Sequence, residues 1–475
     1  MSKDKKDIIF FFTSKVITGI LGLLIVTIYS KMLSTSEYGN YSLISGLINA
    51  LISIFIGWIG SSVLRYYIEY KDNKKEFYTN VWMYTVAMVI LIFIITMIVG
   101  LFSKKIPILM YLLPTIYFTV SYSLAEVLEK ALRASEKTIV YAISLILQSL
   151  ASIGLFIVLK KCFNDGTINI LFSTASSRMI FSIIAIIFLG FTISLNHLKI
   201  NKEMLKRFLK FGIPMIGVWG VSWILNYCDR YIIAMFYNSS EVGVYDMSYR
   251  LAESSINVLI SSFTLAIYPI LIRVWKNHGK KEVEKKLKET IKYYLLMILP
   301  AVVGLSLIVD KLYMGFLDKQ YLSGKNVIII VSIGMLFNGL TSVFNKIWQL
   351  TEKTKMIFRV MVISVIINIV LNIIFIPKIG IDAAAYTTSI SYIISFIITY
   401  VLAKKEISIN FDLKGIIKTI VSTLLMGLFI ILFNNYVNNI FMLVLEIFIA
   451  VVIYSIGNLI LGNVNIKDFR KGSGK

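Results

Sequence analysis

The chain has 475 residues, of which 57% are hydrophobic and only 16% are charged, whereas soluble domains carry about 25% charged residues. It holds 48 Lys and Arg residues against 26 Asp and Glu residues, a net charge of +22. The apolar excess excludes a soluble domain of useful size. The positive charge first suggests a nucleic-acid partner, but the positions of the basic residues, described below, exclude that class of protein.

Long apolar runs separated by mostly short polar joints predict about 14 transmembrane helices, because each bilayer crossing needs roughly 20 apolar residues. The first run is too long for the core of a signal peptide, and it is interpreted as a retained span. The spans are expected at 8–30, 40–64, 78–102, 106–128, 138–159, 168–193, 211–236, 243–272, 290–310, 325–349, 356–376, 381–403, 415–434 and 438–461.

The basic residues follow this map of spans. If the N-terminus is cytoplasmic, the cytoplasmic segments hold 35 of the 48 Lys and Arg residues, the external joints hold nine, and four lie inside spans. This bias fits the positive-inside rule with both termini in the cytoplasm, and it accounts for the net charge without nucleic acid. Two longer basic joints, 199–210 and 276–292, are predicted to be amphipathic helices at the inner leaflet.

A short motif occurs twice in the chain. TSEYGNY (35–41) recurs as SSEVGVY (239–245), with four identities at one offset of 204 residues, and each copy is interpreted as a polar turn between long apolar runs. We infer two copies of one six-span module, which an even span count places in the same orientation about a pseudo-twofold axis along the membrane normal. The expected architecture is an all-α integral membrane protein with an N-lobe (1–196), an amphipathic linker (197–210), a C-lobe (211–405), and two further spans with a tail (406–475).

Charged residues inside the expected spans need an explanation, because each costs about 2.5–3.5 kcal/mol at the bilayer centre. One hypothesis is a cationic cavity between the modules for a phosphate or diphosphate headgroup, which Arg can bind with two hydrogen bonds. The alternatives are that Arg65 and Lys346 extend to the inner interface, that Arg250 pairs with Glu253, and that Arg230 extends outward while Asp229 pairs with another span. The candidate residues for the diphosphate are Lys15, Arg65, Arg178, Arg230 and Arg250.

The seventh expected span carries Gly212, Pro214 and Gly217 near its start. Proline removes a backbone hydrogen bond from a helix, so this segment is a candidate hinge. A static kink is the alternative.

Several enzyme classes lack their motifs here. The chain has no G-x-x-x-x-G-K-[ST] and no D-x-D, and its two histidines, His197 and His278, fall in cytoplasmic joints. Cys162 and Cys228 lie in different modules and suggest neither a disulfide nor a metal site. We therefore expect a protein that is not an enzyme and that has no metal or cofactor.

Four stretches resemble one family in their order along the chain. They are DRYIIAMFY through SSEVGVYDMSYRLAE in 229–254, LSTSEYGNYSLIS (33–45), LRASEKTIVY (132–141) and PKIGIDAAAYTTSIS (377–391). They resemble the bacterial polysaccharide exporters, which are the lipid-linked oligosaccharide flippases of the MOP (multidrug/oligosaccharidyl-lipid/polysaccharide) superfamily.

The resemblance implies two six-span lobes around a central cationic cavity, with two extra helices. It implies that an undecaprenyl-diphosphate-linked sugar unit passes from the inner to the outer leaflet of the bacterial cytoplasmic membrane by alternating access, for cell-surface polysaccharide assembly. Basic residues on spans 1, 2, 7 and 8 are the family's candidates for the diphosphate, and Lys15, Arg65, Arg230 and Arg250 occupy those spans here. Lys15 stands where some relatives carry Arg. Lys binds phosphate as a point charge, so the paired hydrogen bonds that Arg gives to a phosphate are not expected at that position.

The expected partners are the lipid-linked substrate, membrane lipids and other polysaccharide-assembly membrane proteins. Coupling to a proton or sodium gradient, or to the membrane potential, is expected through Asp229, Glu253 or Glu126. An ion-coupled multidrug or cation antiporter of the same superfamily is the main alternative, but the excess of Lys and Arg inside the spans argues against it. A sugar- or acyl-transferring membrane enzyme, a passive scramblase and a structural assembly partner are the remaining alternatives.

Overall fold

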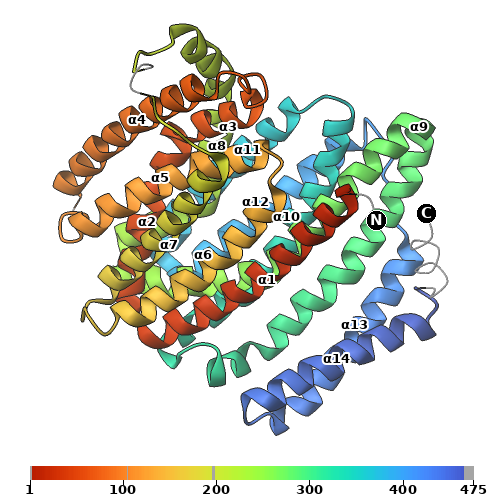
Figure 1. The fold of residues 1–475 in the computed structure, drawn as a ribbon. Helices are drawn as coiled ribbons and strands as arrows, with labels where there is room; N and C mark the ends of the chain where they lie inside the picture. The colour runs from red at the N-terminus through yellow and green to blue at the C-terminus, as the bar shows by residue number, and fades with distance from the viewer. Residues whose placement is uncertain (1–2, 104, 195–197, 465–475) are drawn as a thin grey trace. The chain divides into compact units, whose positions relative to one another are not determined.

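The structure is a computed structural model that describes residues 3–103, 105–194 and 198–464; the side chains of 3–12, 15 and 16 are outside this description. The regular elements of the described residues are all helices (Figure 1). The expected all-α class is therefore confirmed. The chain divides into two compact units, Met1–Met247 and Ser248–Lys475, which are described separately.

Unit 1 contains the first eight helices and the first two turns of the ninth. Ser34, Asp165 and Asn201 accept hydrogen bonds from backbone N–H groups at the starts of α2, α7 and α8, which is the usual role of these residue types at helix N-termini. The helices are α1 (Lys3–Met32), α2 (Thr35–Phe55), α3 (Gly57–Tyr66), α4 (Lys74–Phe102), α5 (Leu112–Ala134), α6 (Thr138–Leu159), α7 (Gly166–Leu189) and α8 (Lys202–Phe236).

Unit 2 contains most of α9 and five further α-helices. α9 runs from Ser239 to Gly315 and consists of two helices that meet at a kink at Gly279, where φ is 71°. The basic joint 276–292, expected to be helical, lies inside it. The others are α10 (Lys325–Leu350), α11 (Lys355–Ile379), α12 (Ile381–Ala403), α13 (Leu413–Phe433) and α14 (Ile440–Ile460), with 3-10 turns at Lys319–Gly324 and Asn434–Tyr436.

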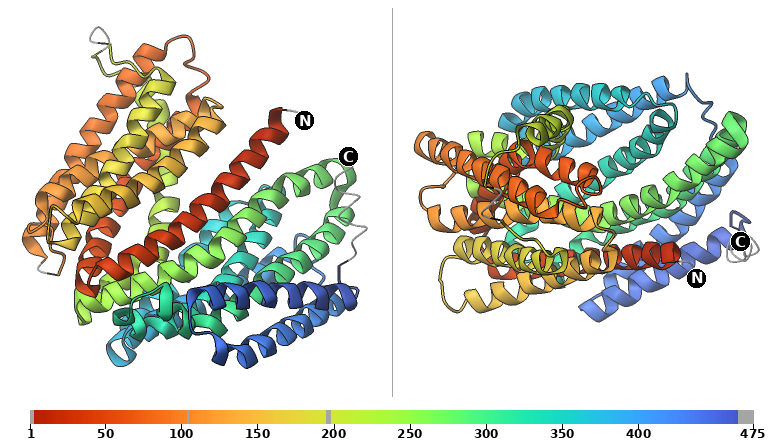
Figure 2. Two further views of the ribbon diagram at one scale, coloured as in Figure 1. Left: turned by 60° about the horizontal axis from the view of Figure 1, so that its bottom comes forward. Right: turned by 45° about the horizontal axis from the view of Figure 1, so that its top comes forward.

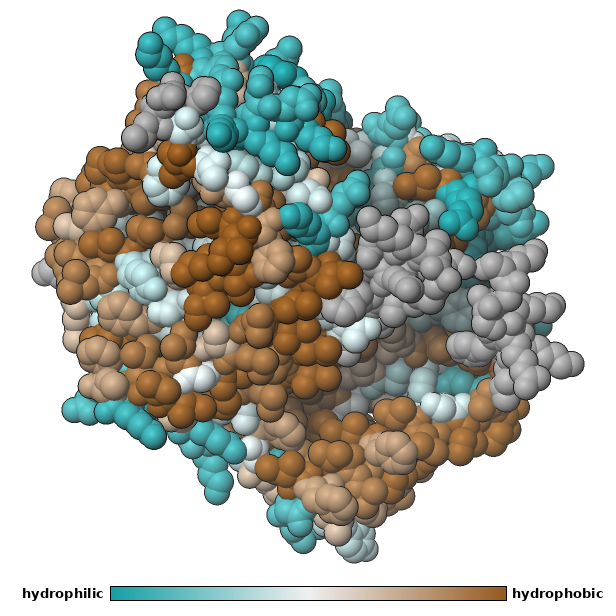
Figure 3. Space-filling view, viewed as in Figure 1, coloured by the Kyte–Doolittle hydropathy of each residue, from teal (hydrophilic) through white to brown (hydrophobic). Residues whose placement is uncertain are grey.

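Ten helices of the described residues are long and apolar enough to cross a membrane, and the bent pair of α2 and α3 (46°) could add one. α9 counts once among the ten although two of the expected spans lie within it, and the described side chains of α1 contribute the apolar segment Ile17–Met32. α5, expected to be a span, is not among the ten and carries four charged residues in its second half. The protein is thus a multi-pass membrane protein. Apolar residues cover much of the face in Figure 3, and hydrophilic residues gather at its upper and lower edges.

Small and hydroxyl-bearing residues let the helices of each unit approach closely, as is usual between membrane helices. In unit 1, a Cβ atom on Gly212 of α8 would lie 2.7 Å from Cβ of Trp58 on α3. In unit 2, the Ser389 hydroxyl of α12 donates to the Ile330 carbonyl of α10 over 2.7 Å. Figure 2 shows α13 and α14 side by side in both views, as their packing requires.

Two sequence interpretations change in detail. The repeated motif is not a turn, because α2 begins at Thr35 and α9 begins at Ser239, so both copies form the first helical turns. The part of the linker from Lys202 onward continues without a break into the seventh expected span, since α8 is one helix of 35 residues that includes Pro214. The expected lobe boundaries and the hinge at Gly212, Pro214 and Gly217 stay predictions.

Candidate functional site: charged and polar groups inside the helices

Arg230 lies in a buried ion network at the junction of α8 and α9 within unit 1. Its Nε and one terminal nitrogen donate to Asp246 Oδ1 over 3.1 and 2.9 Å, and its other terminal nitrogen lies 3.9 Å from Asp229 Oδ2. The Tyr245 hydroxyl donates to Asp229 over 2.6 Å. Arg230 is 2% exposed and both carboxylates are fully buried. The guanidinium charge is therefore compensated inside the protein.

The two copies of the repeated motif contact each other in unit 1. The Thr35 and Ser240 hydroxyls form one hydrogen bond, and the Ser36 and Ser239 hydroxyls form another over 2.9 Å. The offset of 204 makes Thr35 equivalent to Ser239 and Ser36 equivalent to Ser240, so each bond is the symmetry mate of the other. Such reciprocal pairing is the pattern of an isologous, twofold contact.

Two glycines make this contact possible. A Cβ on Gly39 would overlap the Ser239 carbonyl, and a Cβ on Gly243 would overlap the Thr35 carbonyl. These glycines are equivalent positions of the repeat. The sequence identity at this offset thus has a packing reason, because the backbones of α2 and α9 meet at both glycines.

A second group of charges, here called the α5–α7 cluster, consists of Glu126, Glu129 and Lys130 on α5 and Arg178 on α7. Lys130 Nζ lies 3.3 Å from Glu126, and Arg178 lies 3.9 Å from Glu129. The Arg178 guanidinium also lies over the Tyr122 ring, 4.9 Å from its centroid. Among the described residues, Arg178 Nε is buried without a hydrogen-bond partner. The cluster thus balances two basic with two acidic groups, and the Nε–H group of Arg178 remains without an acceptor among the described residues.

Arg65 lies on α3, which packs against both α5 and α8. Its guanidinium is exposed and lies 4.5 Å from the centroid of the Phe211 ring, with no ion pair to any described carboxylate. Five residues earlier on α3, a Cβ on Gly60 would lie 3.1 Å from Lys130 Cγ. Lys130 also faces the Trp219 ring of α8, 5.8 Å from its centroid. α3, α5 and α7 carry the three basic side chains Arg65, Lys130 and Arg178, which we call the basic wall.

The other predicted residues are not members of these groups. Arg250 and Glu253 are half-buried, three residues apart on α9 in unit 2, so they share one face of that helix. The side chain of Lys15 lies outside the described residues. The sequence reasoning missed Asp246, Glu129 and Lys130 as site residues. Asp246 could have been found as a carboxylate inside an expected span.

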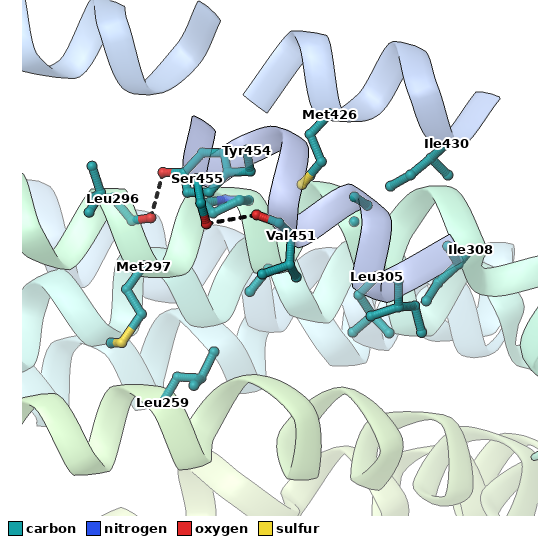
Figure 4. Close-up of a pocket in the computed structure, with 15 residues that line it drawn as sticks. Leu259, Leu296, Met297, Leu305, Ile308, Met426, Ile430, Val451, Tyr454 and Ser455 are labelled. Carbon is teal, nitrogen blue, oxygen red and sulfur yellow. Dashed lines mark hydrogen bonds between the residues drawn. The ribbon is translucent and has the colours of Figure 1, made fainter. Parts of the chain in front are cut away.

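Unit 2 contains an apolar cavity of about 510 Å³ between α9, α13 and α14 (Figure 4). Leu259, Met297 and Leu305 line it from α9, Met426 from α13 and Val451 from α14. The Tyr454 hydroxyl, at its edge, is satisfied by the Leu296 carbonyl over 2.6 Å. The lining offers hydrocarbon contacts and no charge.

Comparison with known proteins assigns the family. The family model described as lipid II flippase MurJ matches residues 41–452, which is most of the chain. The chain belongs to the MurJ lipid II flippase family. The MOP superfamily inferred from the sequence is thereby confirmed, and the MurJ family is one of transporters rather than enzymes.

Two curated relatives agree with membership of the MurJ family. The probable low-salt glycan biosynthesis flippase Agl15 of Haloferax volcanii is 25% identical over 194 residues, which are 40% of each chain. The lipid II flippase MurJ of Bacillus subtilis is 29% identical over 138 residues, covering 28% of this chain and 25% of that protein. The matched stretches thus span two fifths or less of these relatives.

Solved structures show the same fold. A lipid II flippase MurJ in an inward closed conformation matches with a TM-score of 0.75 and 22% identity, covering 95% of this chain and 98% of that one. An outward-facing multidrug resistance transporter of the MATE family matches with a TM-score of 0.58 and 14% identity, covering 86% and 97%. The fold is therefore that of MurJ and the wider MOP superfamily.

Proposed function

We propose that this protein moves an undecaprenyl-diphosphate-linked oligosaccharide from the cytoplasmic to the outer leaflet of a bacterial cytoplasmic membrane, for cell-surface polysaccharide assembly. The observation that carries the proposal is the match of the MurJ family model over residues 41–452. The relationship to a flippase named for glycan biosynthesis supports a glycan-bearing lipid as the cargo. Both termini are proposed to be cytoplasmic.

The basic wall of unit 1 is the proposed contact for the diphosphate. Arg178 has a free buried Nε–H, and Arg65 has no carboxylate partner among the described residues. An anion at either guanidinium gains charge-assisted hydrogen bonds that the protein does not already satisfy. Lys15 and Arg250 are retained as proposed ligands, whereas Arg230 would have to leave two buried carboxylates to bind substrate.

Alternating access needs a contact that opens. The reciprocal pairing of Thr35 and Ser36 with Ser240 and Ser239 is proposed as the external closure. Its surface is small and made of hydroxyls and backbone at two glycines, so water can replace its hydrogen bonds at little cost when it parts.

Ion coupling is proposed at Glu126. Its carboxylate lies 3.3 Å from Lys130, so a proton on Glu126 would release the Lys130 ammonium for an anionic headgroup. Asp229 already accepts from Tyr245 and lies beside Arg230, which favours a structural role. Glu253 remains a second proposed coupling group.

The apolar cavity of unit 2 is the proposed contact for part of the polyprenyl chain. It is bordered by Met297, Met426 and Ile447, whose side chains match a hydrocarbon. Removing such a chain from water is favourable at about 25 cal/mol per Å² of apolar surface.

The test is transport in vesicles. The purified protein is reconstituted with a fluorescent undecaprenyl-diphosphate-linked disaccharide, and the fraction that an external quencher reaches is followed with and without an ion gradient. We expect faster exposure than in empty vesicles, a rate that falls in Arg178→Gln, and wild-type rates for Lys161→Gln, which removes an exposed Lys elsewhere in unit 1. A rate equal to that of empty vesicles, for this lipid and for lipid II, would contradict the proposal.

A further inference from the structure

The inner half of α10, in unit 2, has an unusual distribution of half-buried residues. Between 338 and 350, every residue that is not buried is polar, although the helix is apolar enough to span a membrane. We call these five residues the α10 polar stripe: Asn338, Ser342, Asn345, Lys346 and Gln349. A helix facing lipid would expose apolar side chains instead, so this face meets water or a polar ligand.

α9 carries a matching row. Asn257, Ser261, Thr264 and Tyr268 are spaced by four, three and four residues, as are Asn338, Ser342, Asn345 and Gln349 on α10. This spacing keeps each row on one face of its helix over about 16 Å, at 1.5 Å per residue. We call the first row the α9 polar stripe, and none of its members is buried.

The two stripes meet at one contact within unit 2. Lys346 Nζ lies over the Tyr268 ring, 4.9 Å from its centroid. Lys346 has no ion pair with any described carboxylate. A partly desolvated ammonium that lies over an aromatic ring and has no described carboxylate partner leaves its charge available to an anion.

Two side-chain amides on the α10 polar stripe also have an oxygen atom that accepts no hydrogen bond. Among the described residues, Asn345 Oδ1 and Gln349 Oε1 are buried without a hydrogen-bond partner, and Ser262 Oγ on α9 is in the same state. Buried polar atoms without partners cost about 1–3 kcal/mol each. A ligand that supplied hydroxyl groups would satisfy such oxygens.

The chemistry of the stripes selects the class of ligand. Amide groups both donate and accept, and hydroxyls do the same, which matches the mixed hydroxyls of a sugar. A diphosphate would need several cations, and the stripes offer one. A polyprenyl chain would need an apolar surface, which the α10 stripe lacks.

We propose that the α9 and α10 polar stripes form a carbohydrate subsite, with Lys346 binding one acidic substituent on the glycan. This inference rests on the proposed function, since it assigns the sugar part of the same lipid-linked cargo. It makes unit 2 responsible for glycan selection, whereas the diphosphate is proposed to bind the basic wall of unit 1.

The first experiment compares three probes bound to the full chain in lipid nanodiscs. They are undecaprenyl diphosphate without sugar, the same lipid bearing a neutral disaccharide, and the same lipid bearing a disaccharide with one uronic acid. Lys346→Gln should weaken binding of the uronic-acid probe about tenfold, the loss expected for a hydrogen bond to a charged group, and leave the other two unchanged. Asn345→Leu with Gln349→Leu should weaken both sugar-bearing probes and spare the sugar-free lipid.

The matched control is Lys355→Gln, which removes an exposed Lys nine residues further along the chain, at the start of α11. It should bind all three probes like the wild type. Equal losses for all probes in Lys346→Gln, or no loss for any, would overturn the subsite while leaving the diphosphate function intact. Failure of the wild type to bind any probe would overturn the proposed function and the subsite together.

A second experiment separates a ligand-facing stripe from one that packs against protein. In a background with Cys162→Ser and Cys228→Ser, Ser342→Cys and Asn345→Cys are treated with a membrane-impermeant thiol reagent. Labelling that the uronic-acid probe slows supports the subsite. Absence of labelling, or labelling that the probe does not change, overturns it.

Discussion

Asp246 is the main ion-pair partner that compensates the charge of Arg230. The carboxylate is fully buried and accepts two hydrogen bonds from the guanidinium, over 3.1 and 2.9 Å. Breaking a buried pair by neutralising one partner typically costs about 3–5 kcal/mol, because the other charge is left unpaired in a low-dielectric site. Arg230 retains Asp229 at 3.9 Å, a longer contact that compensates only in part.

Asp246→Asn is therefore expected to lower the free energy of unfolding by about 3 kcal/mol. The measurement is the apparent melting temperature of detergent-purified protein. The double variant Arg230→Met, Asp246→Leu should recover part of the loss, since it removes both charges. An Arg230→Gln variant that kept its melting temperature but lost transport would show instead that Arg230 binds substrate.

Arg178 is in the opposite situation, with one long ion contact and an unused Nε–H. Arg178→Gln is expected to weaken binding of undecaprenyl diphosphate about tenfold, the effect of losing one hydrogen bond to a charged group. The comparison is Arg133→Gln, which removes an exposed Arg from the last turn of α5. Equal affinity for the Arg178 and Arg133 variants would remove Arg178 from the proposed site.

At the scale of elements, α8 joins the amphipathic segment and a membrane span in one helix that includes Pro214. A proline inside a helix removes a hydrogen bond and costs about 3 kcal/mol relative to Ala. Pro214→Ala should therefore raise the melting temperature. If bending at this position accompanies transport, the same change should slow flipping several-fold.

The matched comparison for α8 is Ile213→Ala, which alters an exposed residue next to the proline without restoring a backbone donor. It should leave the flipping rate close to the wild-type value. A Pro214→Ala protein that is more stable and flips at the wild-type rate would show that the proline is a static feature and no hinge.

Elements were easier to predict from the sequence than contacts. Apolar runs of span length and the basic joints located the helices, because each reflects a local physical requirement of the bilayer. Partners were not predictable, since Arg178 and Glu129 lie 49 residues apart and meet only through the packing of α5 on α7. The merging of linker and span in α8 was also missed, because a polar-to-apolar change in composition does not end a helix.

At the scale of the whole molecule, the internal repeat connects sequence to mechanism. Its two copies could be recognised from four identities. Their mutual contact could not be predicted, since the same pattern fits two separate turns. Gly39 and Gly243 are the sequence signal for this contact, because each lies where the backbone of the other copy approaches too closely for a side chain. Where two copies related by a twofold axis meet, their contacts are reciprocal, as these are. If the protein works by alternating access, we expect this contact to break once per cycle.

A reversible cross-link tests this requirement. Ser36 and Ser239 Oγ atoms lie 2.9 Å apart, so cysteines at both positions would place their sulfur atoms close enough for a disulfide with small adjustments. In a background with Cys162→Ser and Cys228→Ser, the double variant Ser36→Cys, Ser239→Cys should stop flipping after oxidation and recover with dithiothreitol. Each single-cysteine variant should flip at the same rate before and after oxidation. The outcome that contradicts this prediction is an oxidised double variant that is shown to be cross-linked and still flips lipid as fast as the dithiothreitol-treated protein. A disulfide would hold the two copies of the repeat together, so unchanged flipping would show that the contact does not open during transport.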